Sequence, residues 1–511
     1  MNQFRRSEKF LLFGAILILI LKIFLLFGFP FTGDEAYFVQ WGHDLSAGYY
    51  DHTPMVGWIN HLMSQGIDDF RFFRLFSLAT TLAVAFFIYK AASDPGRGKI
   101  AAFIWWVSPS SLFLVPMLND TCLVFFGVIS YYFFDRWKKD ERHLWGVLCG
   151  FFLGLSFLSK YLAVVIGVGY VVSLLMAHRR RLPGFLLLLT AGVLPSVVLN
   201  LLWNHQNCWN NIMFNLLNRQ ITQGEGRPDL YIVSLMLLLS PWMVVAIIKV
   251  WSLRAKMSMS WLWLAFAPLG LFAVMSLKRV VGIHWLLVFV IPSYVAISYL
   301  PYSYLNRLSK LSMIYGLILG GAAFFVTKYA DELIERYNLA TTQLQRNAYL
   351  YSVHPQELCQ ALDSMVPGGF ELVVTGYPPS AIFEHVCHKK LTTLFATGVY
   401  GRQCDTRNDI APLAGKDLAL YIDSGVADRY GAFFDSFEVV NKSYQGTQLT
   451  LVLGKGFHFE KYRDEVLRVI AESYYSPPSW LPKGRCGFID RYFPDGIDKV
   501  SHPELDQPLE L

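Results

Sequence analysis

An acidic, aromatic segment at residues 29–70 holds the first candidate chemistry of this chain. It contains no Lys or Arg, and Asp34 and Glu35 stand next to each other with Tyr37 close behind. A positioned carboxylate can accept a proton from a hydroxyl group, and an aromatic ring can stack on a sugar. The stretch GDEAYFVQWGHDLSAG is predicted to be a helix that ends at Gly48. Its first turn would also favour carboxylates for electrostatic reasons, so a charged helix start is the competing interpretation.

A second cluster in the same segment is YYDHTPMVGW at residues 49–58. Tyr50, Asp51 and His52 come just before Pro54, which fixes a bend in the chain. One interpretation is a solvated turn, and the other is a contact to an anion or a metal at the membrane face. His and carboxylate side chains can bind a divalent cation. Because the spacing matches no standard metal motif, a metal site is left open.

The third candidate is Asp120, which follows Asn119 at the outer end of one apolar segment and the start of the next. Asp is a common helix N-cap, and that is the alternative interpretation. An acidic group at membrane depth is otherwise costly and often functional. Together with Asp34, it would put two carboxylates at the outer membrane surface.

Cations are expected on the same side. Lys160 and Tyr161 interrupt a long apolar run, either to reach the interface or to meet a lipid phosphate. The segment LKRVVGIHW adds Lys278, Arg279 and His284. Arg binds phosphate oxygens through two parallel hydrogen bonds. Carboxylates, aromatic rings and cations at one water-exposed face suit a substrate with a sugar, a phosphate and a lipid tail.

The elements that must position these residues are membrane helices. The chain has 511 residues, of which 54% are hydrophobic and 16% charged, whereas soluble proteins carry about 25% charged residues. This composition argues against an ordinary cytosolic enzyme. About 20 apolar residues cross a bilayer as a helix. Eleven spans are predicted, near residues 10–28, 71–93, 100–118, 121–135, 143–158, 161–177, 184–203, 229–251, 259–276, 284–300 and 309–327.

Charge in the loops predicts the orientation. With a cytoplasmic N-terminus, the cytoplasmic segments hold 16 Lys and Arg and the outer segments before the tail hold 7, as the positive-inside rule requires. Eleven spans then place the tail outside, which in a bacterium means the periplasm. Five cysteines fall on that side, where disulfides persist, and their pairing is left open: Cys208, Cys359, Cys387, Cys404 and Cys486.

The chain is predicted to contain three parts. Residues 1–327 form a transmembrane domain that includes the loop 29–70, residues 328–455 form an outer α/β domain, and residues 456–511 form an extension. Within the tail, residues 331–365 and 381–387 are predicted to be helical. The extension is predicted to begin with the helix EKYRDEVLRVIAESYY. Short strands are predicted at 371–377, 391–396, 418–423, 437–440 and 448–454.

These motifs resemble those of polytopic glycosyltransferases of the C-type fold, the bacterial relatives of protein O-mannosyltransferases and of the lipid A aminoarabinose transferase. GDEAYF followed by YYDHTPMVGW is similar to the family's first-loop signature. Further similarity lies in RLFSL, LNDTCLVFF, GLSFLSKYLAVV, LLWNHQNCW, HWLL and, in the tail, ELVVTGYPPSAIF and YGRQCD. The similarity is spread over residues 30–455.

The resemblance implies transfer of a sugar from a polyprenyl-phosphate donor to an acceptor outside the bacterial inner membrane, by one inverting displacement. Asp34 falls on the family's catalytic base and Asp120 on its second acidic position. His52 stands where one branch has a phosphate-binding Lys, and Thr53 replaces a Pro. The acceptor is expected to be lipid A, lipopolysaccharide core, another glycolipid or a protein. The sugar is a hexose or a pentose.

The remaining expectations concern partners and rival functions. No cofactor is firmly implied besides the lipid-linked donor, a divalent cation is left open, and no nucleic-acid partner is expected. The main alternative is a multi-span transporter or a flippase for lipid-linked sugars, which also needs intramembrane charges. A structural subunit is the third option, and it would tolerate loss of both Asp34 and Asp120.

Overall fold

The computed structural model describes residues 2–66, 69–219, 225–253, 256–422, 427–444 and 447–497. Its contacts divide the chain into two compact units. Unit 1 comprises Met1–Phe29, Thr53–Asn200 and Gln223–Ala330, and unit 2 comprises Pro30–His52, Leu201–Thr222 and Asp331–Leu511. The loop 29–70 is therefore divided: its acidic half, with Asp34 and Asp51, clusters with the tail of the chain.

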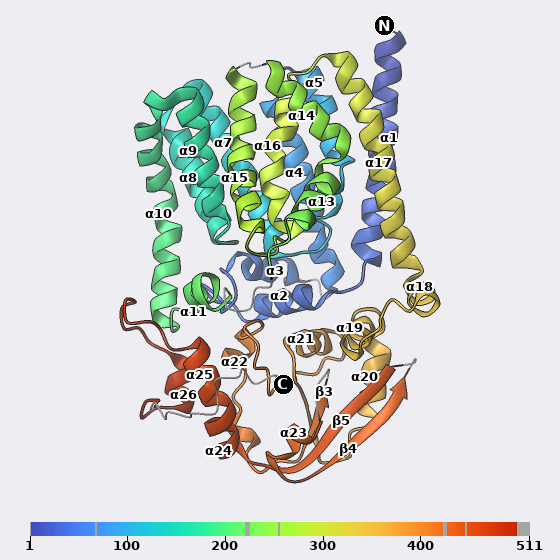
Figure 1. The fold of residues 1–511 in the computed structure, drawn as a ribbon, viewed down its shortest axis with the longest axis vertical. Helices are drawn as coiled ribbons and strands as arrows, with labels where there is room; N and C mark the ends of the chain where they lie inside the picture. Colours follow the sequence, from blue (N-terminus) through green and yellow to red (C-terminus); the bar gives the residue numbers. More distant parts are fainter. Residues whose placement is uncertain are drawn as a thin grey trace. The chain divides into compact units, whose positions relative to one another are not determined.

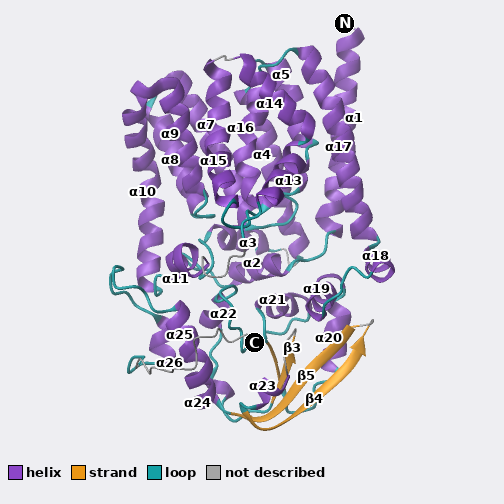
Figure 2. Cartoon of the chain, in the orientation of Figure 1, coloured by secondary structure: helices purple, strands orange, loops and turns teal. Residues whose placement is uncertain are grey.

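Unit 1 consists of helices joined by loops, with no strand among its described residues (Figure 2). Each apolar segment that the sequence marks as a span contains helix. The principal helices are α1 (Asn2–Gly28), α3 (Met55–Ser64), α4 (Leu75–Ala91), α5 (Pro95–Trp106), α7 (Asn119–Asp140), α8 (His143–Phe157), α9 (Ala163–His178), α10 (Leu182–Gln206), α13 (Pro228–Leu239), α14 (Pro241–Leu253), α15 (Lys256–Ser276), α16 (Leu287–Ile297) and α17 (Tyr302–Lys328).

Several of these helices can cross a bilayer. Within the described residues, five are long and apolar enough to do so, or six if one bent pair counts as a single span. Two shorter apolar helices lie at His143–Phe157 and Ile283–Ile297. The chain is therefore a polytopic helical membrane protein, and the count of eleven spans stays a prediction.

Prolines break two of the predicted spans. The segment 229–251 consists of α13 and α14, which are bent by 86° at Ser240 and Pro241. Ser240 has a left-handed backbone with φ of 64°, and Pro241 cannot continue the preceding helix. In the segment 100–118, α5 ends at Trp106 and the short helix α6 (Pro109–Leu112) follows Ser108. In both places the residue before proline is disfavoured in the helical conformation.

The core of unit 1 lies around α16, all of whose residues are buried. This helix packs against α4, α5, α7, α14 and α15, in the middle of the helices coloured from blue to yellow in Figure 1. A helix that is apolar on all sides suits such a position. It follows directly on a short 3₁₀ turn, Ile283–Leu286, which carries His284.

Unit 2 contains a five-stranded sheet in the order β2-β1-β3-β5-β4. Strand β1 pairs in parallel with β2 and β3, whereas β5 is antiparallel to β3 and β4. The predicted strands are confirmed, with altered ends, as β1 (Glu371–Val374), β2 (Thr392–Thr393), β3 (Leu418–Ile422), β4 (Phe434–Tyr444) and β5 (Thr447–Phe457).

The predicted helices of the tail are also present, but the stretch 331–365 is divided into three helices. Two of its helices, α21 and α22, contribute to the site described below. The helices of this region are α18 (Ala330–Tyr337), α19 (Gln343–Val353), α20 (Pro355–Asp363), α21 (Tyr377–Val386), α22 (Gln403–Arg407), α23 (Ala427–Gly431), α24 (Phe459–Tyr462), α25 (Arg468–Tyr474) and α26 (Gly487–Tyr492). From the first loop, α2 (Gly33–His43) packs against α21.

Two disulfides fasten unit 2. Cys208 pairs with Cys486, and Cys359 pairs with Cys387. Cys404 is buried as a free thiol. The first bond joins the segment 201–222 to the C-terminal extension, so these two stretches belong to one folded body although 278 positions separate the two cysteines.

Candidate functional site

The first acidic motif lies at the start of α2. Thr32 is the N-cap, and its side chain accepts a hydrogen bond from the backbone N–H of Glu35 at 3.2 Å. Asp34 and Glu35 therefore occupy the first turn, as expected, but the helix ends at His43 rather than at Gly48. The two carboxylates differ in surroundings: Asp34 is exposed, whereas Glu35 is buried.

The tail supplies a partner for Asp34. The hydroxyl of Tyr377, the first residue of α21, donates a hydrogen bond to Asp34 Oδ1 at 2.9 Å. The approach is close, because a Cβ atom on Gly33 would lie 2.6 Å from Cβ of Pro378. The ring of Tyr377 also lies 4.8 Å from that of Tyr37. Sequence reasoning did not single out Tyr377, although the motif ELVVTGYPPSAIF contains it.

Asp51 is buried and is not part of a solvated turn. Its Oδ2 accepts a hydrogen bond from the Tyr37 hydroxyl at 2.5 Å, and its Oδ1 accepts one from the backbone N–H of Gly401 at 3.2 Å. Burial raises the pKa of Asp51 to about 7, although these two hydrogen bonds act in the opposite direction. The N–H of Gln403 in turn donates to the Tyr37 hydroxyl at 2.9 Å. Asp51 therefore ties the first loop to residues 401–403.

Tyr50 and His52 flank Asp51 in aromatic surroundings. Tyr50 is fully buried, and its N–H donates to Gln403 Oε1 at 2.8 Å. The His52 ring is half-buried. Its centroid lies 5.8, 6.3 and 6.1 Å from the nearest rings, which belong to Phe38, Trp41 and Phe214.

Unit 1 brings three other predicted residues together. Asp120 lies in the first turn of α7, Lys160 lies in the break between α8 and α9, and His284 lies in the turn before α16. Lys160 Nζ donates to both carboxylate oxygens of Asp120 at 2.9 Å. His284 Nε2 is 4.0 Å from Asp120 Oδ2. Both members of the ion pair are buried, whereas His284 is exposed.

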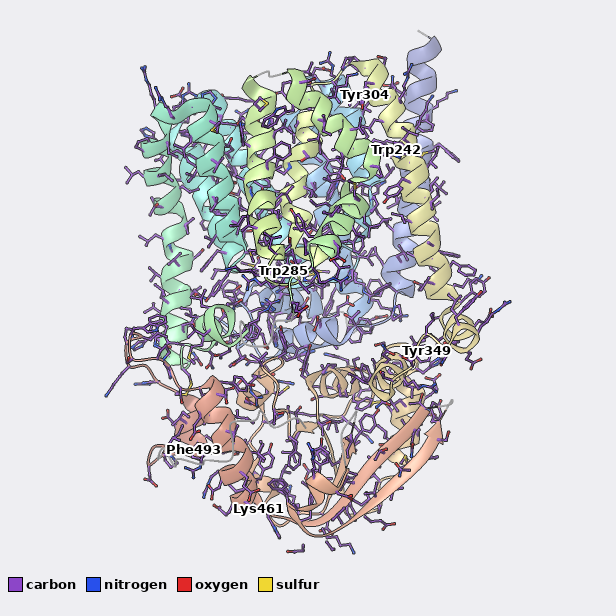
Figure 3. All side chains as sticks on the ribbon, in the orientation of Figure 1. Trp242, Trp285, Tyr304, Tyr349, Lys461 and Phe493 are labelled. Carbon is purple, nitrogen blue, oxygen red and sulfur yellow. A yellow bond between two sulfur atoms is a disulfide. The ribbon has the colours of Figure 1, made fainter. Side chains whose placement is uncertain are left out.

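An indole ring borders this cluster. Lys160 Nζ lies 5.9 Å from the ring centroid of Trp285, which is labelled in Figure 3. The burial of Lys160 excludes the alternative in which its side chain only reaches for the interface. The ammonium of Lys160 is therefore held in place between the carboxylate of Asp120 and the indole ring of Trp285.

The other predicted residues of unit 1 are less enclosed. The Tyr161 hydroxyl donates to Asn200 Oδ1 at 2.7 Å, and its ring stacks on Phe157 with 4.9 Å between centroids. Lys278 is exposed, and Arg279 is partly exposed in the turn after α15. Among the residues that the structure describes, no group of three or more His, Cys, Asp and Glu side chains could hold a metal ion.

The predicted site residues therefore form two sets. Asp34, Tyr37, Tyr50, Asp51 and His52 belong to unit 2, and Asp120, Lys160 and His284 belong to unit 1. Each set combines acidic with polar or aromatic groups. The juxtaposition of Asp34 with Asp120 stays a prediction.

Comparison with known proteins supports the family resemblance. Residues 51–203 match the family model described as dolichyl-phosphate-mannose-protein mannosyltransferase. That stretch includes Asp51, Asp120 and Lys160. The resemblance to C-type-fold glycosyltransferases is confirmed.

Individual relatives agree with this family. The chain is 26% identical over 187 residues to lipid A galacturonosyltransferase RgtD of Rhizobium johnstonii, a match that covers 35% of this chain and 39% of that protein. The structure is similar to ArnT from Cupriavidus metallidurans in the apo state, with a TM-score of 0.60, 11% identity and coverage of 88% of this chain and 98% of that one. The same ArnT bound to undecaprenyl phosphate matches with a TM-score of 0.60, 12% identity and coverage of 87% and 98%. The chain and ArnT therefore share one fold.

Proposed function

We propose that this protein is a membrane glycosyltransferase that moves a sugar from a polyprenyl-phosphate donor to a glycolipid. The observation that carries the proposal is the family match over residues 51–203, which contains the ion pair of Asp120 and Lys160. The similar ArnT binds undecaprenyl phosphate, and the similar RgtD acts on lipid A. Lipid A or lipopolysaccharide core is therefore the acceptor we favour, with a hexose or a pentose as the transferred sugar.

The topology that goes with this activity is also proposed. Residues 1–327 would form the transmembrane catalytic domain in the bacterial inner membrane, with eleven spans and a cytoplasmic N-terminus. Residues 328–455 would form a periplasmic domain, followed by the extension 456–511. In this arrangement the start of α2 and the start of α7 both face the periplasm, where the acceptor lies.

The reaction would be a single displacement at the anomeric carbon. Asp34 takes the proton of an acceptor hydroxyl as that oxygen forms the new glycosidic bond. The bond from the anomeric carbon to the phosphate oxygen breaks, and the polyprenyl phosphate leaves with the electron pair. The anomeric configuration is inverted. Asp34 suits a base because its side chain is exposed.

Cations would stabilise the leaving phosphate. Lys160 is held in place by Asp120, and His284 lies beside the same carboxylate. A preorganised positive group near a developing negative charge lowers the barrier without reorganisation during the reaction. Arg279, Lys278 and His52 remain proposed contacts to the phosphate, and Tyr37, Tyr50, Asp51 and Tyr161 remain proposed contacts to the substrates.

The test is transfer by purified full-length protein. The assay supplies undecaprenyl-phosphate sugars, labelled in the sugar, with lipid A as acceptor. Asp34→Asn is expected to lower kcat by about 10²–10⁴-fold, the usual contribution of a general base. Glu438→Gln, which neutralises an exposed carboxylate on β4, is the matched control and should leave the rate unchanged.

Two outcomes would contradict different parts of the proposal. A normal rate for Asp34→Asn would rule out the base assignment. If the wild-type protein transferred no sugar from any lipid-linked donor, the enzymatic function itself would be wrong. Mass spectrometry of envelope lipids from a deletion strain would identify the missing sugar and its acceptor.

A further inference from the structure

A cavity of about 310 Å³ lies in unit 2 beside the partner of Asp34. Its size falls at the lower end of the range for small-molecule sites, about 300–1,000 Å³. The ring of Tyr377 lines it, while the hydroxyl of the same residue donates to Asp34. The lining residues are Thr375, Gly376, Tyr377, Pro378, Phe395, Ala396, Thr397, Gly398, Tyr400, Gly401 and Tyr430.

One wall of the cavity is the loop 395–401, whose carbonyl groups accept hydrogen bonds from Arg402 and Tyr474. The buried guanidinium of Arg402 donates from Nη1 to the carbonyl oxygens of Ala396 at 2.6 Å and Gly398 at 3.0 Å. The hydroxyl of Tyr474 donates to the carbonyl of Thr397 at 2.9 Å. Because these carbonyls already have protein partners, the wall needs no ligand to keep its shape. A preformed site loses less entropy on binding.

The backbone of this wall is unusual at both ends. Phe395 adopts a left-handed conformation with φ of 57°, and Gly401 has φ of 75°. A Cβ atom on Gly401 would lie 2.1 Å from Cδ1 of Tyr377, so only glycine allows the loop to approach that ring. Strained backbone persists where the surroundings enforce it, and it is concentrated in binding and catalytic sites.

The chemistry of the lining favours a neutral sugar ring. Tyr377, Tyr400, Phe395 and Tyr430 contribute aromatic rings, and Thr397 and Tyr400 contribute hydroxyl groups. Among the described residues that line the cavity, none carries a charged side chain. One cation is close, because the guanidinium carbon of Arg219 lies 6.0 Å from the ring centroid of Tyr400, but Arg219 does not line the cavity. A pyranose ring needs no counter-charge, since it can stack on an aromatic face and hydrogen-bond through its hydroxyl groups.

We propose that this cavity is a pyranose-binding subsite, in which one sugar ring of a substrate sits against Tyr377 and Tyr400 next to the candidate base. The inference rests on the proposed function for the identity of that substrate. The ring belongs either to the acceptor or to the donor, and the two sources differ in which Michaelis constant the subsite controls.

Binding can be tested without turnover. The probe is N-acetylglucosamine at millimolar concentration, and the readout is saturation-transfer NMR with the full chain in lipid nanodiscs, prepared without sugar-based detergents. Thr397→Trp fills the cavity and should lower the saturation-transfer signal at least tenfold. Thr397→Ser keeps the space and should retain the signal. An absent wild-type signal, or an equal signal in Thr397→Trp, would overturn the proposal.

A second pair of variants keeps the proposal testable if Thr397→Trp does not fold. Tyr400→Ala removes an exposed aromatic face, and Tyr400→Phe keeps it. The former should lower the signal about tenfold and the latter should not. Signal retained in Tyr400→Ala as well as in Thr397→Trp would place sugar binding elsewhere.

Kinetics then distinguish the source of the ring and separate this proposal from the proposed function. If the ring belongs to the acceptor, Thr397→Trp raises the acceptor KM about tenfold and leaves the donor KM unchanged, and the reverse holds for a donor ring. Loss of activity in Asp34→Asn with unaltered KM values in Thr397→Trp would support the enzyme and refute the subsite. Wild-type protein that binds the probe in the cavity but transfers no sugar would support the subsite and refute the enzyme.

Discussion

Two carboxylates of the first loop, Asp34 and Asp51, show how differently one short segment can use the same side chain. Asp34 is exposed and accepts one hydrogen bond from a tyrosine hydroxyl. Asp51 is buried at 4% exposure, and each of its oxygens accepts a hydrogen bond. An acceptor hydroxyl can reach the former but not the latter. The exposure of Asp34 fits the proton transfer proposed for it, whereas Asp51 holds the loop to residues 401–403.

The largest expected difference between the two is in stability. Asp51→Ala leaves the buried donors of Tyr37 and Gly401 without their acceptor, and each such loss costs about 1–3 kcal/mol. At pH 6 the apparent Tm should therefore fall by several degrees. Asp34→Ala, which alters an exposed group, should change it by about one degree or less. Thermal unfolding of the full chain in detergent measures both, and equal shifts would contradict the comparison.

A smaller effect is the dependence of stability on pH. The pKa of Asp51 is about 7 in the folded protein, against 3.8 for the ordinary carboxyl. Between pH 3.8 and pH 7 the carboxyl of Asp51 keeps its proton in the folded protein but has lost it in the unfolded chain. The free energy of unfolding therefore falls as the pH rises, and it levels off above about pH 7. From pH 5.5 to 7 the loss is about 2 kcal/mol.

Asp51→Asn should flatten this part of the profile, while Asp34→Asn should leave it as it is in the wild type. Unfolding temperatures measured across the pH range test both variants. A wild-type slope in Asp51→Asn would show that another group causes the dependence.

The smallest effect concerns how Asp34 is held. Tyr377→Phe removes the hydroxyl that donates to Asp34 but keeps the ring beside Tyr37. Loss of a hydrogen bond to a charged group is worth about 1.5–3 kcal/mol, so we expect kcat to fall about tenfold while the donor KM stays constant. Tyr337→Phe is the matched control, because Tyr337 is an exposed tyrosine of the same unit that does not line the cavity. An unchanged kcat for Tyr377→Phe would remove this tyrosine from the positioning of Asp34.

Local signals in the sequence predicted most of the secondary structure. Continuous apolar runs marked helices such as α1 and α9, and alternating or β-branched runs marked strands such as β1 and β5. Two predicted spans were broken instead, at Ser240–Pro241 and Ser108–Pro109. The sequence did indicate these breaks, because proline disfavours the helical conformation of the residue that precedes it.

The candidate site was only partly predictable, for a physical reason. The residue types of Asp34, Asp120 and Lys160 pointed to chemistry, but their partners depend on contacts between distant stretches. Tyr377 meets Asp34 across 343 positions, and Gly401 meets Asp51 across 350. No local pattern encodes such pairs. The burial that raises the pKa of Asp51 likewise exists only after the tail has folded over the loop.

The bond between Cys208 and Cys486 has a consequence for how the molecule is made. Cys486 is synthesised 278 residues after its partner, so all of unit 1, which ends at Ala330, has been synthesised before this crosslink can form. Until then Cys208 is open to wrong pairing with Cys359 or Cys387, which are translated earlier than Cys486. Correct pairing is therefore favoured if the short-range bond between Cys359 and Cys387 forms first, because Cys208 then cannot pair with either of them and stays available for Cys486 once that residue has been synthesised.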